Sequence, residues 1–523
     1  MKSNPTAFDG YHIMGLYDFT FYDQINRNAA AFNRSAAWHE VDDKKNISFA
    51  DYKTRIDQLA GGLKAVGVEK GDRLGALGVN STEFFMLYGA AAALGAIMLP
   101  VNWRLSADEV CYNLNDGSPR LIFADAAFQE LIEGRRSELP SVQAFYNLKA
   151  DSGDFESFAA LLEDESRTFP SEVASDDGFV IIHTAAVAGR PRGALLSHAN
   201  VLSAGLHIAY YFNLSPKDVH LNLLPLFHVA GLFMAIAAFQ SGVLNVNMSK
   251  FDGSSAAGLI EDFGVSLFFD FPPILAATLS AAEEENREIS SLKAVAGLGT
   301  PEDIDRFQKK TKGTYYCMYG QTETSMLATI GRYNDAPGSA GKPVTLGEVR
   351  TVDGNGHCRP AGEAGEIVMK GPMVFQGYWN LPEENARTFR DGWHHTGDMG
   401  RFDQDGFLFY AGRMPEKELI KPGGENVYPA EVENIIVQHP AVEKTVVFGV
   451  PDAKWKEGIK AVCLLKPGAT LTAKDLIAFV GERIARYKKP HYVQVVTELP
   501  LKTDGSPDRE KIKSLYGAAA PVD

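Results

Sequence analysis

The sequence has few cysteines and no motif that would pair them. The 523-residue chain holds four, Cys111, Cys317, Cys358 and Cys463, which lie far apart without a CxxC pair. A disulfide framework and a zinc knuckle are therefore not expected. This cysteine usage predicts a reducing, cytoplasmic location.

An excess of basic residues and a long apolar run are also missing. The formal net charge is −15, which argues against a sequence-independent nucleic-acid binder, because such a protein needs basic surface to neutralise phosphates. The longest apolar stretch, residues 89–101, is shorter than the roughly 20 residues that span a membrane, so we interpret it as a buried helix leading into a strand. The N-terminal MKSNPTAFDG has no apolar core, so no secretory signal is expected.

What is present is the pattern of a folded multidomain α/β protein. Hydrophobic residues make up 45% and charged residues 22%, and the length exceeds that of one ordinary core. Ile56, Leu59, Leu63 and Val66 recur at helical spacing, which predicts a helix with one buried face. Short apolar strands alternate with such helices and predict a mostly parallel sheet.

The predicted strands fall into two groups. The first has the sequences LIFAD (121–125), GFVIIHT (178–184), HLNLLPL (220–226), GVLNVNM (242–248) and VSLFFDF (265–271). After about residue 338 the segments become short and are broken by Gly and Asp, as in GEIVMKG, DGFLFYAGR and KTVVFGV, which predicts antiparallel β structure. The segment PAEVENIIVQHP predicts a helix with Pro429 in its first turn.

The first candidate site motif is HTAAVAGRPRGA at residues 183–194. It follows the strand FVII and precedes a helix that starts near Ser197, and its small residues let backbone N–H groups approach an anion. A small-residue turn between a strand and a helix is also a common structural feature, so the motif alone leaves both interpretations open. The Walker sequence GxxxxGK[ST] is absent.

Three further motifs carry hydroxyl and carboxylate groups. YGQTET (319–324) sets a hydroxyl beside a carboxylate, which suits a contact with magnesium and phosphate. WHHTGD (393–398) places an Asp after a glycine turn, where it could accept ribose hydroxyls. The fourth combines Gly412-Arg413 with KELIKPGGENVYPAEVE (417–433). Taken alone, YGQTET or WHHTGD is more typical of a turn or a helix cap than of a site.

In this order, the four motifs resemble those of the adenylate-forming superfamily, which includes acyl-CoA synthetases, the adenylation domains of peptide synthetases and beetle luciferases. The resemblance runs from about Ser48 to Arg509. It also covers LPLFHVAGL (224–232), GLGTPED (297–303) and RYKKP (486–490).

The resemblance implies an α/β fold. It predicts a large N-terminal domain, residues 1–416, with two α/β sheet subdomains and a β-barrel, and a small mobile α+β cap domain, residues 417–523. It implies an AMP-forming acyl-CoA synthetase that uses ATP, magnesium and coenzyme A on a largely apolar carboxylic acid. No nucleic acid and no membrane span are expected, and a homodimer is left open.

The resemblance also implies residue roles. Thr322 would contact the α-phosphate, Glu323 would hold magnesium, and Asp398 would bind the ribose hydroxyls beside Arg413. Nucleotide and coenzyme A contacts are expected from Thr184, Gly189, Arg192, Gly299, Thr300, Pro301, Tyr319, Gly320, Gly423, Gly424 and Glu425. The acyl group would be bordered by His228, Val229, Phe271, Gly297, Leu298 and Met326. His228 would also act as a gate, although a simple packing role is an equal alternative.

The sequence departs from the family pattern mainly at the adenylation half. The phosphate loop lacks three hydroxyls of TSGTTGxPKG and has Arg192 in place of lysine, and Ser506 occupies the position of the C-terminal catalytic lysine. Lys502, Arg509 and Lys511 are candidate substitutes, with solvated surface charges as the alternative. Two residues are inserted before Lys417, and Glu418 aligns with the usual hinge aspartate. Two other functions therefore stay open: loading of a separate carrier-protein thiol, and a nucleotide- or acyl-CoA-binding protein without turnover.

Overall fold

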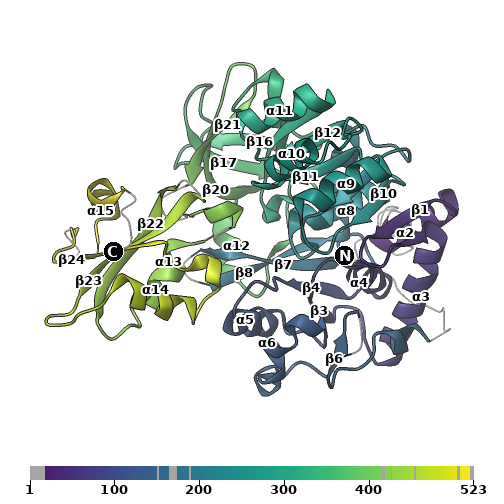
Figure 1. Cartoon of the computed structure of the whole chain (residues 1–523), viewed down its shortest axis with the longest axis horizontal. Helices are drawn as coiled ribbons and strands as arrows, with labels where there is room; N and C mark the ends of the chain where they lie inside the picture. Colours follow the sequence, from purple (N-terminus) through teal and green to yellow (C-terminus); the bar gives the residue numbers. More distant parts are fainter. Residues whose placement is uncertain are drawn as a thin grey trace, which may run out of the picture.

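The computed structural model describes residues 18–149, 152–163, 173–187, 190–413, 419–425, 427–452, 455–502 and 507–518. Figure 1 shows a large body, coloured purple to green, and a smaller yellow-green part beside it that ends the chain. The large body contains two mostly parallel sheets and an antiparallel sheet, and the smaller part has a sheet of its own. This confirms the predicted fold class of two α/β subdomains, a barrel-like sheet and a small C-terminal domain.

The first α/β subdomain is built on a nine-stranded sheet in the order β15-β14-β13-β12-β11-β9-β10-β1-β2. Its strands are β1 (Ala36–Glu40), β2 (Lys45–Ser48), β9 (Val219–Asn222), β10 (Leu244–Asn247), β11 (Leu267–Asp270), β12 (Ala294–Gly297), β13 (Thr314–Tyr319), β14 (Thr329–Arg332) and β15 (Lys342–Pro343). The central strands are parallel, as predicted from the alternating pattern, and the two edges are antiparallel.

The second α/β subdomain has a seven-stranded sheet in the order β18-β8-β7-β4-β3-β5-β6. Its strands are β3 (Arg73–Leu77), β4 (Ile97–Val101), β5 (Leu121–Ala124), β6 (Ala144–Asn147), β7 (Gly178–Val187), β8 (Arg190–Ser197) and β18 (Gly377–Tyr378). The pair β7 and β8 is an antiparallel hairpin. The expected direct turn from strand to helix at residues 183–194 was therefore wrong, because a second strand precedes the helix.

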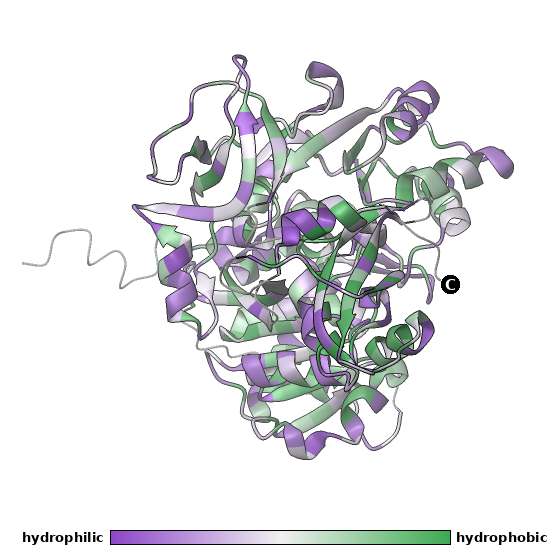
Figure 2. Ribbon diagram, turned by 90° about the vertical axis from the view of Figure 1, so that its left-hand side faces the viewer, coloured by the Kyte–Doolittle hydropathy of each residue, from purple (hydrophilic) through white to green (hydrophobic). Residues whose placement is uncertain are grey.

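Helices cover both sheets (Figure 1). In the large body they are α2 (Phe21–Ala31), α3 (Phe49–Ala65), α4 (Thr82–Leu94), α5 (Ala107–Gly117), α6 (Glu130–Glu133), α7 (His198–Tyr211), α8 (Val229–Gln240), α9 (Gly253–Phe263), α10 (Ile274–Glu284), α11 (Pro301–Thr311) and α12 (Pro382–Thr388). One hydrophobic core runs through both subdomains and includes the stacked rings of Trp38 and Phe85, 4.6 Å apart. Figure 2 shows green, hydrophobic segments in the interior strands and purple ones in the outer turns.

Two sequence predictions can be compared directly with these helices. Helix α4 is buried almost throughout, ends at Gly95 in the left-handed conformation, and leads into β4, as the apolar run 89–101 predicted. Ile56, Leu59 and Leu63 of α3 are buried, but Val66 is 39% exposed. The expectation for Val66 was wrong because the helix ends at Ala65, so its periodicity no longer applies there.

The antiparallel sheet follows residue 338, as predicted, and curls beside the two subdomains. It contains β16 (Glu348–Val352), β17 (Gly365–Lys370), β19 (Phe389–Arg390), β20 (Trp393–Phe402) and β21 (Leu408–Arg413). The small part contains β22 (Val442–Asp452), β23 (Lys456–Leu465), β24 (Tyr492–Val496), α13 (Pro429–Ile436), α14 (Ala473–Gly481) and α15 (Arg509–Tyr516) around a separate core. Among the described residues, no helix has both the length and the apolar character needed to cross a membrane.

Candidate active site

Several predicted site residues, among them Phe271, Gly297 and Tyr319, lie at the carboxyl ends of β11, β12 and β13, where parallel α/β sheets commonly bind ligands. Two glycines allow the chain to turn sharply there. A Cβ atom on Gly297 would lie 1.9 Å from the carbonyl oxygen of Asp270, and one on Gly320 would lie 1.8 Å from that of Met326. The backbone at both positions therefore has no room for a side chain, which keeps the two turns close to the neighbouring strand ends.

Asp398 is the centre of a buried polar cluster. Its Oδ2 accepts hydrogen bonds from Tyr319 Oη (2.8 Å) and Gln321 Nε2 (2.5 Å). Arg413, its register partner on β21, places Nε 3.3 Å from Asp398 Oδ1. Asp398 is 2% exposed, and its Oδ1 has no hydrogen-bond partner. An oxygen whose contact is this ion pair with Arg413 keeps the capacity to accept a hydrogen bond from a ligand hydroxyl, and buried acceptors without a hydrogen bond are rare in folded proteins.

Glu323 lies on the short 3-10 helix η4 (Thr322–Thr324) and is fixed by a second group. Tyr378 Oη donates a 2.7 Å hydrogen bond to Glu323 Oε1. The ring of Tyr378 in turn lies under the guanidinium of Arg192, 4.0 Å from ring centre to Cζ. Arg192 NH1 also pairs with Glu384 Oε2 at 3.0 Å. Arg192 of the β7–β8 hairpin is therefore held directly above the tyrosine that orients Glu323.

The described residues of the predicted phosphate loop lie on β7 and β8. Thr184 Oγ1 donates to the carbonyl oxygen of Arg192 across the hairpin (3.3 Å), so this hydroxyl supports the strands. Arg192 is 7% exposed, and its Nε has no hydrogen-bond partner. Gly189 lies outside the described residues. A buried guanidinium with an unused N–H group could hold an anion at this hairpin.

The predicted adenine wall has a rigid foundation. Thr300 caps α11 by accepting from Asp303 N, and Pro301 occupies the first turn of that helix. Tyr315 Oη accepts from Gly299 N and donates to Asp270 Oδ2 at 3.0 Å. Burial raises the pKa of Asp270 to about 6. The opposite wall is Tyr319, whose ring stacks on Tyr410, with 6.0 Å between ring centres.

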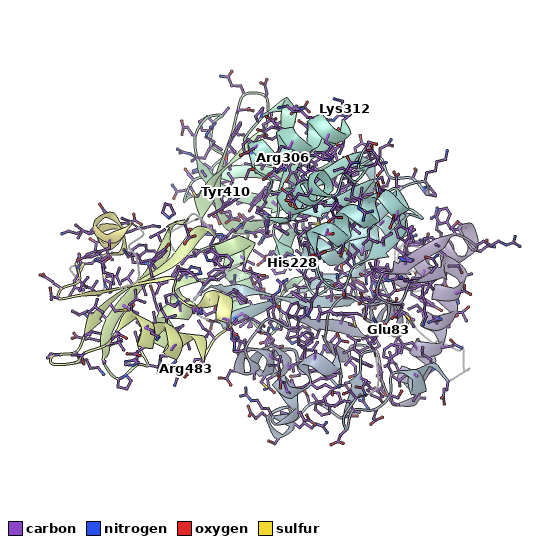
Figure 3. The ribbon with its side chains drawn as sticks, in the orientation of Figure 1. Glu83, His228, Arg306, Lys312, Tyr410 and Arg483 are labelled. Atoms are coloured by element: carbon purple, nitrogen blue, oxygen red, sulfur yellow. The ribbon has the colours of Figure 1, made fainter. Side chains whose placement is uncertain are left out.

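His228, which is predicted to border the acyl group, lies at the start of α8. It is the N-cap of α8, where its Nδ1 accepts from Ala230 N (3.3 Å), so the proton of the neutral ring resides on Nε2. Burial, assisted by the nearby charge of Arg104, lowers the pKa of His228 to about 4. Its ring meets that of Phe271 edge to face at 6.0 Å. Figure 3 places His228 near the middle of the molecule and Tyr410 toward the small domain.

The other residues of the predicted acyl border differ in how far their side chains are exposed to solvent. Met326 is buried and has a positive φ of 78°, whereas Leu298 is 46% exposed. Val229 begins α8 and is buried. A half-exposed Leu298 beside buried apolar side chains gives this border an open side and an apolar interior.

The small domain contacts the large domain beside the Asp398 cluster. Gly423 and Gly424 belong to the 3-10 helix η7 (Pro422–Gly424), and the next residue, Glu425, pairs with Arg104 of the large domain. Arg413 NH1 donates to Tyr428 Oη at 3.0 Å. The loop with the motif PGGE therefore faces the large domain next to the Asp398 cluster.

The residues at Glu323 fit a magnesium ion shared with phosphates. The described part of the chain contains no group of three or more His, Cys, Asp or Glu side chains that could hold a metal ion by themselves. Magnesium commonly uses one or two carboxylates, with waters and substrate phosphates completing the shell. A single oriented carboxylate at Glu323 meets that requirement.

Two family models match the chain. The model described as AMP-binding enzyme covers residues 25–379, and the model described as AMP-binding enzyme C-terminal domain covers residues 431–505. Indoleacetate–CoA ligase from Aromatoleum aromaticum is 33% identical over 480 residues, which are 90% of this chain and 94% of the relative. The chain belongs to the AMP-binding enzymes. The family and the named relatives show that this AMP-binding enzyme is an acid–thiol ligase.

Solved structures add information on shape. A protein from Rhodopseudomonas palustris, assigned as a long-chain-fatty-acid CoA ligase, is 44% identical with a TM-score of 0.73, covering 76% of this chain and 100% of that one. The o-succinylbenzoate CoA synthetase of Bacillus subtilis is 27% identical in two complexes. Its double mutant with a product analogue gives a TM-score of 0.82 (94% and 98% covered), and its complex with the acyl-adenylate gives 0.69 (95% and 99% covered). This AMP-binding enzyme is thus closer in shape to the product-analogue complex.

The candidates for a replacement of the C-terminal lysine of this AMP-binding enzyme do not gather at the cluster. Arg509 pairs with Glu433 (2.6 Å) and donates to the carbonyl oxygen of Val447, both in the small domain. Ser506 lies outside the described residues, and Lys502 and Lys511 are exposed. Arg509 thus has a role within its own domain.

Sequence reasoning missed several side chains that hold the site. Gln321 lies in YGQTET, where the sequence pattern predicts no role for it, although its Nε2 donates to Asp398. Tyr378 and Glu384 lie in QGYWNLPEE, which has no chemical pattern of its own and reaches the site only through the pairing of β18 with β8. The partner of Lys488, Glu109, is far away in sequence and could not be inferred from spacing.

Proposed function

We propose that this AMP-binding enzyme activates a largely apolar carboxylic acid with ATP as an acyl-adenylate and transfers the acyl group to coenzyme A. The acid's carboxylate oxygen would form a bond to the α-phosphorus of ATP while the bond to pyrophosphate breaks. The thiol sulfur of coenzyme A would then bond to the acyl carbon, and AMP would leave with the mixed-anhydride oxygen.

The buried Asp398 cluster supports this proposal most strongly. Its Oδ1 forms an ion pair with Arg413 but has no hydrogen-bond partner, so it offers one acceptor for a ribose hydroxyl. Oδ2 already accepts hydrogen bonds from Tyr319 and Gln321. A second ribose hydroxyl would bind to Oδ2 only if one of these two donors moved away. An enclosed carboxylate of this kind binds the nucleotide more strongly than an exposed one, because water competes less.

The phosphates would lie between η4 and the hairpin. Thr322 and the Arg192 guanidinium would contact them, and Glu323 would hold magnesium, which neutralises phosphate charge when bound. Tyr378 keeps the Glu323 carboxylate in one orientation. Oriented charges that need no rearrangement during the reaction are the main catalytic resource for such displacements.

The acyl group would enter beside His228 and Phe271. The neutral ring of His228 and the apolar side chains of Val229 and Met326 disfavour a charged substrate tail. Relatives named for indoleacetate and for long-chain fatty acids support an apolar or aromatic acid. The Glu425 loop and Tyr428 would line the route of the coenzyme A thiol.

The test is an incubation of the purified protein with magnesium ATP, coenzyme A and a panel of aromatic, alicyclic and fatty acids. We expect AMP and one acyl-CoA in equal amounts with one acid class, measured by mass spectrometry. AMP without acyl-CoA would indicate a carrier-protein thiol as the acceptor. Nucleotide binding without AMP from any acid would contradict the proposal.

A second function, nucleotide or acyl-CoA binding without turnover, has one observation in its favour. The hairpin lacks three hydroxyls of the family pattern, and Thr184 is engaged across the strands. The oriented Glu323 and the intact Asp398 cluster favour turnover. If the departures from the family pattern slow adenylation alone, we expect preformed acyl-adenylate to yield acyl-CoA faster than acid plus ATP does. Equal rates would contradict this hypothesis.

A further inference from the structure

Three ionisable side chains from both domains meet at a buried point of the domain contact. Lys488, in the 3-10 helix η8 (Arg486–Lys488) of the small domain, places Nζ 2.5 Å from Glu109 Oε1 and 2.5 Å from Glu431 Oε1. The exposed fractions of the side chains are 4% for Lys488, 10% for Glu109 and 9% for Glu431. Glu109 belongs to α5 of the large domain, whereas Glu431 belongs to α13 of the small domain.

Glu109 is held in place from both sides of the contact. Its Oε2 accepts from Ser106 N and Ser106 Oγ at the start of α5, both at 2.8 Å. The same oxygen accepts from Ala485 N of the small domain at 3.0 Å. Burial opposes the charged form of Glu109, but Lys488 and the Ser106 donors outweigh it and keep its pKa below the ordinary value. Glu109 is therefore an ionised group that both caps its helix and receives the small domain.

The ammonium of Lys488 is required by both carboxylates. Burial raises the pKa of Glu431 above its ordinary value, and its Oε2 has no hydrogen-bond partner. Without Lys488, the docked arrangement would bury two carboxylates side by side with no opposite charge. Removing one partner from a buried ionic group is strongly unfavourable, so the docked arrangement depends on this lysine far more than on a surface ion pair.

The geometry points to Lys488, with Glu109 and Glu431, as a latch that holds the small domain in the arrangement for thioester formation. We refer to these three residues as the latch. The inference rests on the proposed function. Rotation of the small domain away from α5 keeps Lys488 with Glu431 but separates it from Glu109. The latch therefore stabilises the docked arrangement of the two domains. It does not stabilise the fold of the large domain by itself.

Two observations assign the docked arrangement to the second half-reaction. In it, the PGGE loop meets Arg104 through Glu425, and Tyr428 meets Arg413 beside the Asp398 cluster. The whole chain is also closer in shape to the product-analogue complex of o-succinylbenzoate CoA synthetase than to its acyl-adenylate complex, with TM-scores of 0.82 and 0.69.

Helix α5 also connects the latch to the phosphate hairpin. Tyr112 Oη donates to the carbonyl oxygen of Pro191 (3.3 Å), and Asp116 Oδ2 lies 2.9 Å from His183 Nε2. Glu109, Tyr112 and Asp116 are spaced three and four residues apart, so they share one face of the helix. The helix that receives the small domain therefore also supports the strands that carry Arg192.

The decisive experiment measures the two half-reactions separately in Lys488→Met and in Lys489→Met. Lys489 is the adjacent, exposed lysine, so the second variant is a matched control. We expect Lys488→Met to slow the conversion of preformed acyl-adenylate and coenzyme A to acyl-CoA at least about tenfold, because the docked population falls. ATP–pyrophosphate exchange with the acid should stay within about twofold of wild type, and Lys489→Met should change neither. Equal losses in both half-reactions, or none, would overturn the proposal.

A charge exchange separates the latch from a general folding effect. Because Glu109 also accepts from Ser106 and Ala485, the exchange is made at Glu431, whose Oε2 has no hydrogen-bond partner. Glu431→Lys alone places two cations beside one carboxylate, and Lys488→Glu alone gathers three carboxylates. Their combination restores two carboxylates and one cation at the same point. We expect the double variant to recover at least about tenfold of the thioester-forming rate lost in Lys488→Glu. No recovery, with the protein folded by circular dichroism, would contradict the latch.

A distance measurement keeps the latch testable if the proposed function fails. Spin labels on cysteines placed at the exposed positions Glu130 and Lys474, in a Cys358→Ser background, report the separation of the domains. We expect Lys488→Met to broaden the distance distribution and Lys489→Met to leave it unchanged. An unchanged distribution in Lys488→Met would overturn the latch, whereas a wild-type protein without either half-reaction would overturn only the proposed function.

Discussion

At the residue scale, the chemistry of the site depends on side chains that are fixed before any ligand binds. Asp398 is oriented by Tyr319 and Gln321, and Glu323 is oriented by Tyr378. These supports hold the carboxylates of β20 and η4 in defined positions. One prediction tests the charge of Asp398, and another tests the hydroxyl that orients Glu323.

Replacing Asp398 with Asn keeps the shape of the side chain and removes its charge. We expect the KM for ATP to rise at least about tenfold, because a hydrogen bond to a charged group contributes about 1.5–3 kcal/mol. The measurement is steady-state AMP formation at varied ATP. Asp405→Asn, at an exposed turn of the same sheet, is the control and should leave this KM unchanged. A normal KM in Asp398→Asn would contradict the assigned ribose contact.

Replacing Tyr378 with Phe removes one hydroxyl and keeps the ring beneath Arg192. Glu323 then loses its fixed orientation, so we expect the magnesium concentration for half-maximal adenylation to rise about tenfold. A magnesium titration of pyrophosphate exchange measures the effect. If the titration is unchanged while overall activity falls, Tyr378 supports Arg192 rather than Glu323.

At the scale of elements, the sequence predicted strands and helices well where periodicity and apolar runs decide them. The run 89–101 became α4 and β4, and PAEVENIIVQHP became α13 with Pro429 at its start. The β7–β8 hairpin was missed because its second strand, RPRGALLS, contains two arginines, a proline and a glycine. Pairing with β7 and β18, which sequence alone does not reveal, makes it a strand.

The sequence predicted the motif residues of the candidate site but not the residues that support them. Motif order identified Thr322, Glu323, Asp398 and Arg413 as a group, and the structure gathers the segments that carry them. The supporting residues Tyr378 and Glu109 act through tertiary contacts, so no local pattern could reveal them. Roles that depend on bound ATP or coenzyme A stay predictions.

Two helix glycines allow a prediction with an internal control. A Cβ on Gly231 of α8 would lie 2.3 Å from the carbonyl oxygen of Pro225, whereas one on Gly258 of α9 would meet nothing closer than 3.9 Å. We expect Gly231→Ala to destabilise the large domain by about 1–3 kcal/mol, because the backbone must move. Gly258→Ala should stabilise it by up to about 1 kcal/mol, since alanine favours helix. Urea unfolding followed by circular dichroism distinguishes the two, and equal midpoints would contradict the packing.

At the scale of the whole molecule, buried ionisable groups couple stability to pH. Burial lowers the pKa of His198, His220 and His228 to about 4. In the unfolded chain a histidine binds its proton near pH 6.5, so the contribution of each group is complete above that pH and is lost as pH falls toward 4. Asp125 and Asp270, whose pKa burial raises to about 6, act in the opposite direction.

The histidine contribution can be isolated with a variant. His220 pairs with Asn245 inside the nine-stranded sheet at 2.7 Å, and asparagine can make a similar contact. We expect His220→Asn to remove about 2 kcal/mol of the stability difference between pH 7 and pH 5. His357→Asn, at a side chain that is 80% exposed, should leave that difference unchanged. Urea unfolding at both pH values measures it, and an unchanged difference in His220→Asn would contradict a neutral buried histidine.

The domain arrangement links these scales to function. The small domain has its own core and contacts the large domain through Lys488, Glu425 and Tyr428. The predicted boundary between residues 416 and 417 lies outside the described residues. The proposed function, with two half-reactions at one site, predicts that the small domain changes its contacts between them.

The most direct test of the account is a rapid-quench single turnover with excess enzyme, ATP labelled at the α-phosphate and the preferred acid. Without coenzyme A, the label should accumulate as enzyme-bound acyl-adenylate. Addition of coenzyme A should then convert it to AMP with an equal amount of acyl-CoA. Label that appears as ADP, or as AMP without any need for the acid, would contradict adenylate formation at the Asp398–Glu323 site.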